Sequence, residues 1–165
     1  MTAKNIDWPD DWFVPGGAYI TDTAKMRLRP PGHWTKVELE IPRVPQSMND
    51  NEIRTNWRGF HTVKKSWQEE MELLLMAQRV KRDGYKRAIA GAFMRFPRAG
   101  KRRDTNNFTT LLNKALGDAL ARSPHGGYGA IPDDDERRYF FGGVEFEDPG
   151  PARTLIWIYL QPKEG

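Results

Sequence analysis

Hydrophobic and polar residues alternate over Trp34–Ile41, where Val37, Leu39 and Ile41 are separated by charged residues. Successive side chains of a strand point to opposite faces, so this period of two predicts a half-buried strand. Further strands are predicted at Tyr85–Phe96, Tyr139–Phe146 and Thr154–Leu160. The last two are expected to pair, because Pro149-Gly150-Pro151 predicts a turn between them. The residues of the second strand expected near the core are Ile89, Gly91, Phe93 and Met94.

Apolar residues at spacings of three and four predict two helices. The first covers His61–Arg82, and Gly84 lies close to the position that commonly ends a helix. The second covers Thr105–Ala121, with Asp104 or Thr105 as a suitable N-cap. The apolar stripes are Val63, Trp67, Met71, Leu74 and Leu75 in the first helix, and Phe108, Leu111, Leu112, Ala115, Leu116 and Ala119 in the second.

The predicted order is strand, helix, strand, helix, strand, strand. In a chain of 165 residues this favours one α+β domain, a small mixed sheet packed against two main helices, over residues 34–161. Residues 1–33 are rich in Pro, Gly and Trp and are predicted to form an irregular arm. The polar stretch Gln46–Phe60 has no clear period and is predicted to be a loop.

Positive charge is concentrated in one part of the chain. The net charge is only +4, yet Arg79–Arg103 holds ten Lys or Arg residues and one acid, Asp83. Such a local field favours a polyanion such as nucleic acid or an anionic membrane surface, although a solvated basic face is equally consistent with it. No amphipathic helix with a free apolar face is visible, which makes the membrane surface the weaker alternative.

Several classes are excluded or disfavoured by composition. The chain has no cysteine, so disulfides and thiolate metal sites are excluded. The longest apolar stretches, such as Leu155–Leu160, are too short to span a bilayer, and no signal peptide is recognisable. The expected location is therefore the cytoplasm, with no membrane partner.

Acidic, basic and amide side chains gather between Lys101 and Asp135. At about 100° per residue, Asn107, Lys114 and Asp118 lie within about 40° of one another around the second helix. The start of that helix favours anions and follows a basic run. Acids beside a phosphate site make sense chiefly when a divalent cation lies between them. The acids in question are Asp104 at the helix start and Asp133, Asp134 and Asp135 on a later loop.

Each feature also has an ordinary structural explanation. Asp104 can be a helix cap, Lys114 and Asp118 an i,i+4 surface pair, and the three consecutive aspartates a turn. Their joint occurrence beside a basic approach favours a metal site facing phosphate.

The same residues form a pattern that resembles the RusA family of Holliday junction resolvases. Arg102–Phe108 is similar to that family's Arg-Arg-Asp-x-Asp-Asn-Leu, and Lys114–Leu120 to its Lys-x-x-x-Asp-Ala-Leu. Ile131–Asp134 then resembles the loop that ends in Asp-Asp. The members of the RusA family are small homodimeric, Mg²⁺-dependent endonucleases common in phages. The resemblance implies a RusA-like fold, paired nicking of four-way DNA junctions, and the host cytoplasm if the chain is phage-encoded.

The resemblance also implies roles for individual residues. Asp104, Asn106 and Asp134 would hold Mg²⁺, or Mn²⁺, with Asp118, Asp133 or Asp135 able to compensate for a missing ligand. Asp104, Asp134 and Lys114 would be catalytic, with Lys114 neutralising charge on the scissile phosphate. The residues expected to contact the DNA backbone are Lys101, Arg102, Arg103, Arg98, Arg58 and Arg54.

Two departures from the family pattern separate rival hypotheses. Asn106 stands where the family has Asp, and four extra residues, about one helical turn, precede Lys114. The chain can therefore be a junction resolvase, a nuclease for other branched or flap DNA, or a non-catalytic branched-DNA-binding protein with an altered metal site. The aromatic residues considered as wedges between bases are Phe60, Trp57 and Tyr128, although core packing is the default role for most aromatics.

Overall fold

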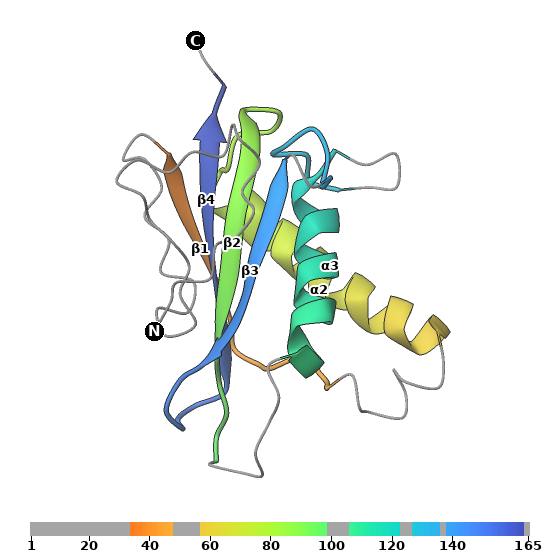
Figure 1. Ribbon diagram of the computed structural model, residues 1–165, viewed down its shortest axis with the longest axis vertical. Coiled ribbons are helices and arrows are strands. Elements are labelled where there is room, and N and C mark those ends of the chain that lie inside the picture. Colours follow the sequence, from red (N-terminus) through yellow and green to blue (C-terminus); the bar gives the residue numbers. More distant parts are fainter. Residues whose placement is uncertain (1–33, 48–56, 99–105, 123–126, 136–137, 164–165) are drawn as a thin grey trace, which may run out of the picture.

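Four strands form one sheet in the computed structural model, which describes residues 34–47, 57–98, 106–122, 127–135 and 138–163. The strands are β1 (Thr35–Ile41), β2 (Tyr85–Arg95), β3 (Tyr139–Phe146) and β4 (Arg153–Pro162). The helices are α2 (Trp57–Ala77) and α3 (Asn106–Leu120), and both pack on the same face of the sheet (Figure 1). The predicted α+β class, a small mixed sheet with two main helices, is confirmed.

The order of the strands is β1-β4-β2-β3. β2 and β3 are parallel, and β4 runs antiparallel to both of its neighbours, β1 and β2. Parallel strands need a crossover connection, and α3 supplies the one between β2 and β3. β1 and β2 also run in the same direction, on either side of β4, and α2 connects them. The two helices thus lie next to each other as successive crossovers.

The expected pairing of the last two strands is wrong. β3 is an edge strand beside β2, whereas β4 lies between β1 and β2. Residues 154–160 are almost continuously apolar, which suits a strand covered on both faces. β3 carries a one-residue bulge opposite Ala90–Ala92, where Gly143 has a φ of +114°. Only glycine adopts such a backbone readily, and bulges of this kind are typical of sheet edges.

The face of β2 that meets the helices differs from the prediction except at Met94, which lies in the main core as expected. Its helix-facing residues are Ala88, Ala90, Ala92 and Met94, all fully buried. Ile89 is buried on the opposite face, with Trp34 and Trp157. Because β2 is covered on both sides, hydrophobicity does not distinguish its two faces, and the small alanines occupy the side on which the helices pack.

Helix α2 begins and ends before the predicted limits. It starts at Trp57, where exposed side chains interrupt the apolar pattern by which the sequence predicts a helix. Within these first turns, Thr62 Oγ1 donates to the carbonyl of Arg58 at 2.9 Å. At the other end, Val80 N–H bonds to Leu75 O at 3.1 Å and Arg79 N–H to Met76 O at 3.0 Å. Arg79 has a φ of +56°. This is a Schellman cap with arginine at the left-handed position, so the predicted extension to Arg82 and Gly84 is wrong.

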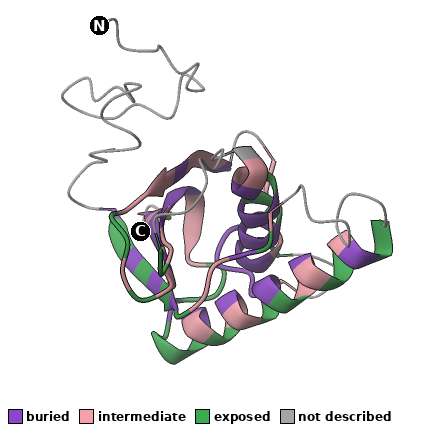
Figure 2. Ribbon diagram, turned by 90° about the horizontal axis from the view of Figure 1, so that it is seen from below, coloured by how far each residue is buried: buried purple, intermediate pink, exposed green. Residues whose placement is uncertain are grey.

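Helix α3 is the central packing element. The six residues of its predicted apolar stripe are all buried, and they contact the helix-facing side of the sheet and α2. In α2 the buried apolar residues are Trp67, Met71 and Leu75. Figure 2 shows the buried residues of the helices on the side that faces the sheet. The polar side of α3 is therefore left for the candidate site.

Candidate functional site

The pairing of Lys114 with Asp118 on α3 is present. Lys114 Nζ lies 3.5 Å from Asp118 Oδ1, one helical turn apart. The Lys114 side chain is 57% exposed, whereas that of Asp118 is only 23% exposed. The carboxylate of Asp118 thus pairs with the ammonium group of a lysine whose side chain is still largely exposed to solvent.

A buried lysine of α2 completes this ion pair, and the sequence analysis did not select it. Lys64 Nζ lies 2.8 Å from Asp118 Oδ2 and 3.3 Å from Gln68 Oε1. Both oxygens of Asp118 therefore face ammonium groups. This arrangement favours Asp118 as the anchor of two lysines over a role as a metal ligand.

The sequence does contain a signal that Lys64 is buried and paired. It lies seven residues before Met71 and eleven before Leu75, which places it on the apolar stripe of α2. A lysine in a stripe of this kind is almost never fully buried without a partner.

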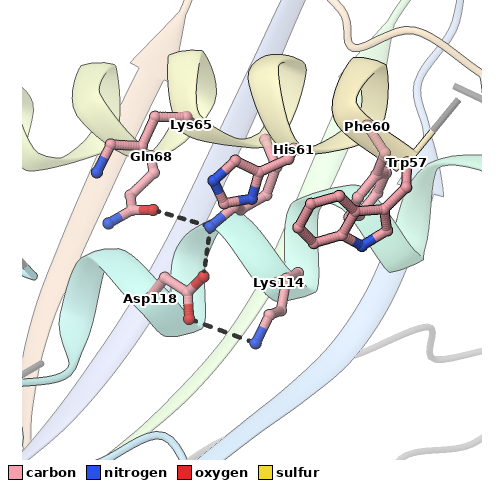
Figure 3. A pocket seen from close by; sticks show the side chains of 8 residues that line it. Trp57, Phe60, His61, Lys65, Gln68, Lys114 and Asp118 are labelled. Atoms are coloured by element: carbon pink, nitrogen blue, oxygen red, sulfur yellow. Dashed lines mark hydrogen bonds and ion pairs between the residues drawn. The ribbon is translucent and has the colours of Figure 1, made fainter. Parts of the chain in front are cut away.

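A cleft of about 550 Å³ lies between α2 and α3 (Figure 3). Its polar floor holds Lys64, Gln68 and Asp118, and Lys114 lines it from α3. Its lining from the first turns of α2 consists of Trp57, Phe60, His61 and Lys65.

The loop that carries Asp134 is fixed to the C-terminal end of α3. Ile131 N–H bonds to Leu120 O at 3.1 Å, and Arg122 N–H bonds to Ile131 O at 2.9 Å. These bonds hold the chain beside the last turn of α3 just before the three aspartates. Asp133 Oδ1 then accepts the Asp134 N–H at 2.8 Å, and Asp135 pairs with Arg138.

Asp134 packs against Gly117 of α3. A Cβ atom at position 117 would lie 3.1 Å from Asp134 Oδ2 and 3.2 Å from the Tyr139 ring. A glycine inside a helix costs about 1 kcal/mol relative to alanine, and here its missing side chain leaves room for the carboxylate. The structure thus brings Asp134 close to Lys114 and Asp118, residues that lie at least 16 positions away in the sequence.

The surroundings of Asp134 disfavour its negative charge. Partial burial raises the pKa of its carboxyl group, and the hydrogen bond with Asp133 and the charge of Asp118 act in the same direction. The nearby charge of Lys114 opposes them. A carboxylate held among other acids is the kind of group that a divalent cation stabilises.

A second hollow, of about 370 Å³, lies on the other side of Lys114. Lys114, Asp134, Asn113 and Tyr139 line it, together with two threonines of α3, Thr109 and Thr110. The buried Tyr139 hydroxyl donates to Asn113 O at 3.2 Å. Burial, followed by the charges of Asp134 and Asp118, raises the pKa of Tyr139 well above its ordinary value, so the phenol stays neutral. Lys114 therefore lines both hollows.

The residues present fit a magnesium ion in part. Asp134 and Asp133 offer the hard oxygen donors that Mg²⁺ prefers, and Mg²⁺ usually keeps several waters. Asp104 lies outside the described residues, as does the side chain of Asn106, whose backbone opens α3. Within the described ranges, no three His, Asp or Glu side chains are grouped closely enough to hold a metal.

The predicted DNA-contacting residues are described only in part. Arg58 lies in the first turn of α2 and Arg98 follows β2, and both are exposed. Arg54, Lys101, Arg102 and Arg103 lie outside the described residues.

The three aromatic residues considered as wedges have different environments. Tyr128 is buried, and its hydroxyl donates to Val80 O. Phe60 is half-buried and packs against the core. Trp57 is 75% exposed. Core packing thus accounts for the first two.

No protein-family model and no curated protein matches this chain. Among the described residues, neither helix has the length and apolar character needed to cross a membrane.

Proposed function

We propose that the chain is a Mg²⁺-dependent endonuclease of the RusA type that hydrolyses phosphodiester bonds in four-way DNA junctions. The observation that carries the proposal is the meeting of Lys114 and Asp134 in one hollow beside α3. These are two of the three residues to which the sequence pattern assigns catalysis. The third, Asp104, is two residues before the start of α3.

Lys114 is the residue proposed to neutralise charge on the scissile phosphate. Its ammonium is exposed, and Asp118 orients it from the buried side. The negative charge of Asp118 is also compensated by Lys64. The three groups together therefore carry a net charge of +1, which favours an anionic ligand. An anchored cation costs little reorganisation when charge develops on the phosphate.

The proposed metal ligands are Asp104, Asn106 and Asp134, with Asp133 able to contribute. A bound Mg²⁺ would supply Lewis-acid stabilisation of phosphate charge and an activated water. Asn106 can offer a carbonyl oxygen but no negative charge, so the site is expected to bind the ion more weakly than one with three carboxylates.

The basic residues, the dimer and the location complete the proposal. Arg58 and Arg98, with Arg54, Lys101, Arg102 and Arg103, would contact the DNA backbone, which makes binding strongly dependent on salt. A homodimer would supply two sites for paired nicks, and the expected location remains the cytoplasm.

The test is cleavage of a synthetic four-way junction with and without Mg²⁺, using the wild type, Asp104→Asn and Asp134→Asn. Symmetric nicking that needs Mg²⁺ and is abolished by either substitution supports the proposal. Asn106→Asp is the companion variant, and a large gain in cleavage would show that position 106 is a weakened ligand. Lys36→Ala, on the outer strand β1, is the control and should cleave like the wild type.

A second candidate is a non-catalytic protein that binds branched DNA. Asn106, together with an Asp118 whose two oxygens face lysines, favours it, because both reduce the carboxylates available to a metal. Tight junction binding without cleavage in Mg²⁺ or Mn²⁺ would favour this candidate over the nuclease.

A further inference from the structure

Trp57 presents its indole to solvent at the rim of the cleft between α2 and α3. It is 75% exposed, the highest value among the large hydrophobic side chains of the described residues. Its ring stacks on His61 one turn later, with centroids 5.4 Å apart and planes inclined by 15°. In Figure 3 this pair comes from α2, whereas Lys114 and Asp118 line the cleft from α3.

Core packing does not account for this indole. Phe60 belongs to the same first turn of α2 and does pack against the core, which leaves Trp57 facing away from it. An i,i+4 contact with His61 stabilises the helix and also holds the indole in one orientation. A large aromatic ring that is both exposed and held in place is a ready stacking surface.

The charges around the ring indicate the chemistry of its ligand. Three lysines line the cleft, Lys64, Lys65 and Lys114, against a single acid, Asp118. The lining therefore carries a net charge of +2 with His61 neutral. An apolar peptide would not match this net positive charge, and an acidic peptide need not offer a flat ring. A nucleotide offers both a flat base and a phosphate.

We propose that Trp57 and His61 form a stacking site for an unpaired nucleobase, whose phosphate is held by Lys65 and Lys114. The cleft volume of about 550 Å³ falls in the range of small-ligand sites. This inference rests on the proposed function and deepens it, because Lys114 is shared with the proposed catalytic hollow. A base inside a duplex cannot present its face to the indole, whereas an unstacked base at a branch point can.

Binding measured in EDTA tests the site without cleavage. The probes are a labelled oligothymidylate, an abasic strand of the same length, and a blunt duplex, followed by fluorescence anisotropy. Trp57→Ala should weaken oligothymidylate binding about tenfold, because the loss of one base–aromatic stack lowers the affinity of single-strand binding proteins by roughly this factor. Trp57→Phe should recover most of the loss. Abasic-strand binding should be the same in wild type and both variants.

Leu73→Ala is the matched control, since Leu73 is also a large exposed side chain of α2, at 64%, outside the cleft lining. It should bind all probes like the wild type. Equal oligothymidylate binding by the wild type and Trp57→Ala would overturn the stacking site. So would an equal loss on the abasic strand.

Failure of the stacking site and failure of the proposed function are distinguishable. Mg²⁺-dependent junction cleavage, with Trp57→Ala binding oligothymidylate like the wild type, removes the stacking site and leaves the nuclease. Trp57-dependent binding without cleavage in any divalent metal removes the nuclease and leaves the stacking site.

Discussion

Lys64 Nζ lies 2.8 Å from Asp118 Oδ2, and this ion pair joins α2 to α3 across 54 positions of the chain. The Lys64 side chain is only 9% exposed. The same aspartate holds the exposed Lys114 with its other oxygen. One carboxylate thus both stabilises the packing of the helices and orients a cation of the candidate site.

Asp118→Asn is expected to lower the free energy of unfolding by about 3 kcal/mol, because it leaves the buried ammonium of Lys64 without a counter-charge. Urea unfolding followed by circular dichroism at pH 7 measures this loss. Lys114→Met should change the unfolding free energy by less than about 0.5 kcal/mol, since that pair is exposed. A double replacement, Lys64→Met with Asp118→Leu, should recover most of the stability. A loss below about 0.5 kcal/mol for Asp118→Asn would contradict the role of this pair.

Lys114→Ala is expected to reduce Mg²⁺-dependent cleavage of a four-way junction by about 10²–10³-fold, the usual effect of removing a group that stabilises developing charge. Single-turnover cleavage at saturating enzyme isolates this effect from binding. Lys36→Ala removes a lysine from β1, the edge strand farthest from β3 in the sheet, and should leave the rate unchanged. Activity of Lys114→Ala within twofold of the wild type would exclude Lys114 from the reaction.

Gly117→Ala tests the contact between α3 and the aspartate loop. The added methyl group would lie 3.1 Å from Asp134 Oδ2 and must displace it by a few tenths of an ångström. The gain in helix propensity, about 1 kcal/mol, offsets the crowding, so stability should change little. The affinity for Mg²⁺ should fall about tenfold, as is usual when the support of a ligand is disturbed.

The measurement is the rise in unfolding temperature on Mg²⁺ titration, which reports ligand binding to the folded state. Asp134→Asn serves as the reference for a lost ligand and should show the smallest rise. A wild-type response from Gly117→Ala would mean that the position of Asp134 against Gly117 does not matter for metal binding.

The ion pair between Glu147 and Arg153 is expected to stabilise the fold at neutral pH and to lose this effect in acid. The guanidinium of Arg153 binds both carboxylate oxygens, at 3.0 and 2.8 Å, and its hydrogen bonds lower the pKa of Glu147 below the usual 4.5. A lowered folded-state pKa means that the stabilisation is present above pH 4.5 and disappears as the pH falls through the lowered value.

Glu147→Gln should therefore be less stable than the wild type at pH 7, by up to about 1 kcal/mol for a partly exposed pair. The difference should shrink steadily as the pH falls below 4.5. Urea unfolding of both proteins across this range checks the sign. A difference that stays constant down to the acid unfolding transition would contradict the ion-pair explanation.

Local periodicity was sufficient to predict the elements. The alternation in β1 and the apolar stripe of α3 are both found where the sequence indicates them, because these elements have one buried face and one polar face. The errors arose where that contrast is weak. In β2 both faces are covered, and α2 begins with two exposed residues, Trp57 and Arg58, so hydrophobic periodicity does not mark a buried face in either segment.

The sequence by itself determined the fold class, the α3 stripe and the pairing of Lys114 with Asp118, since these depend on neighbours within one or two helical turns. Only the tertiary structure decided that β4 lies between β1 and β2, that Lys64 of α2 neutralises Asp118, and that Asp134 packs on Gly117. These contacts join segments far apart in the chain. They depend on which strands pair and how two helices pack on one face, information that no local repeat of side chains contains.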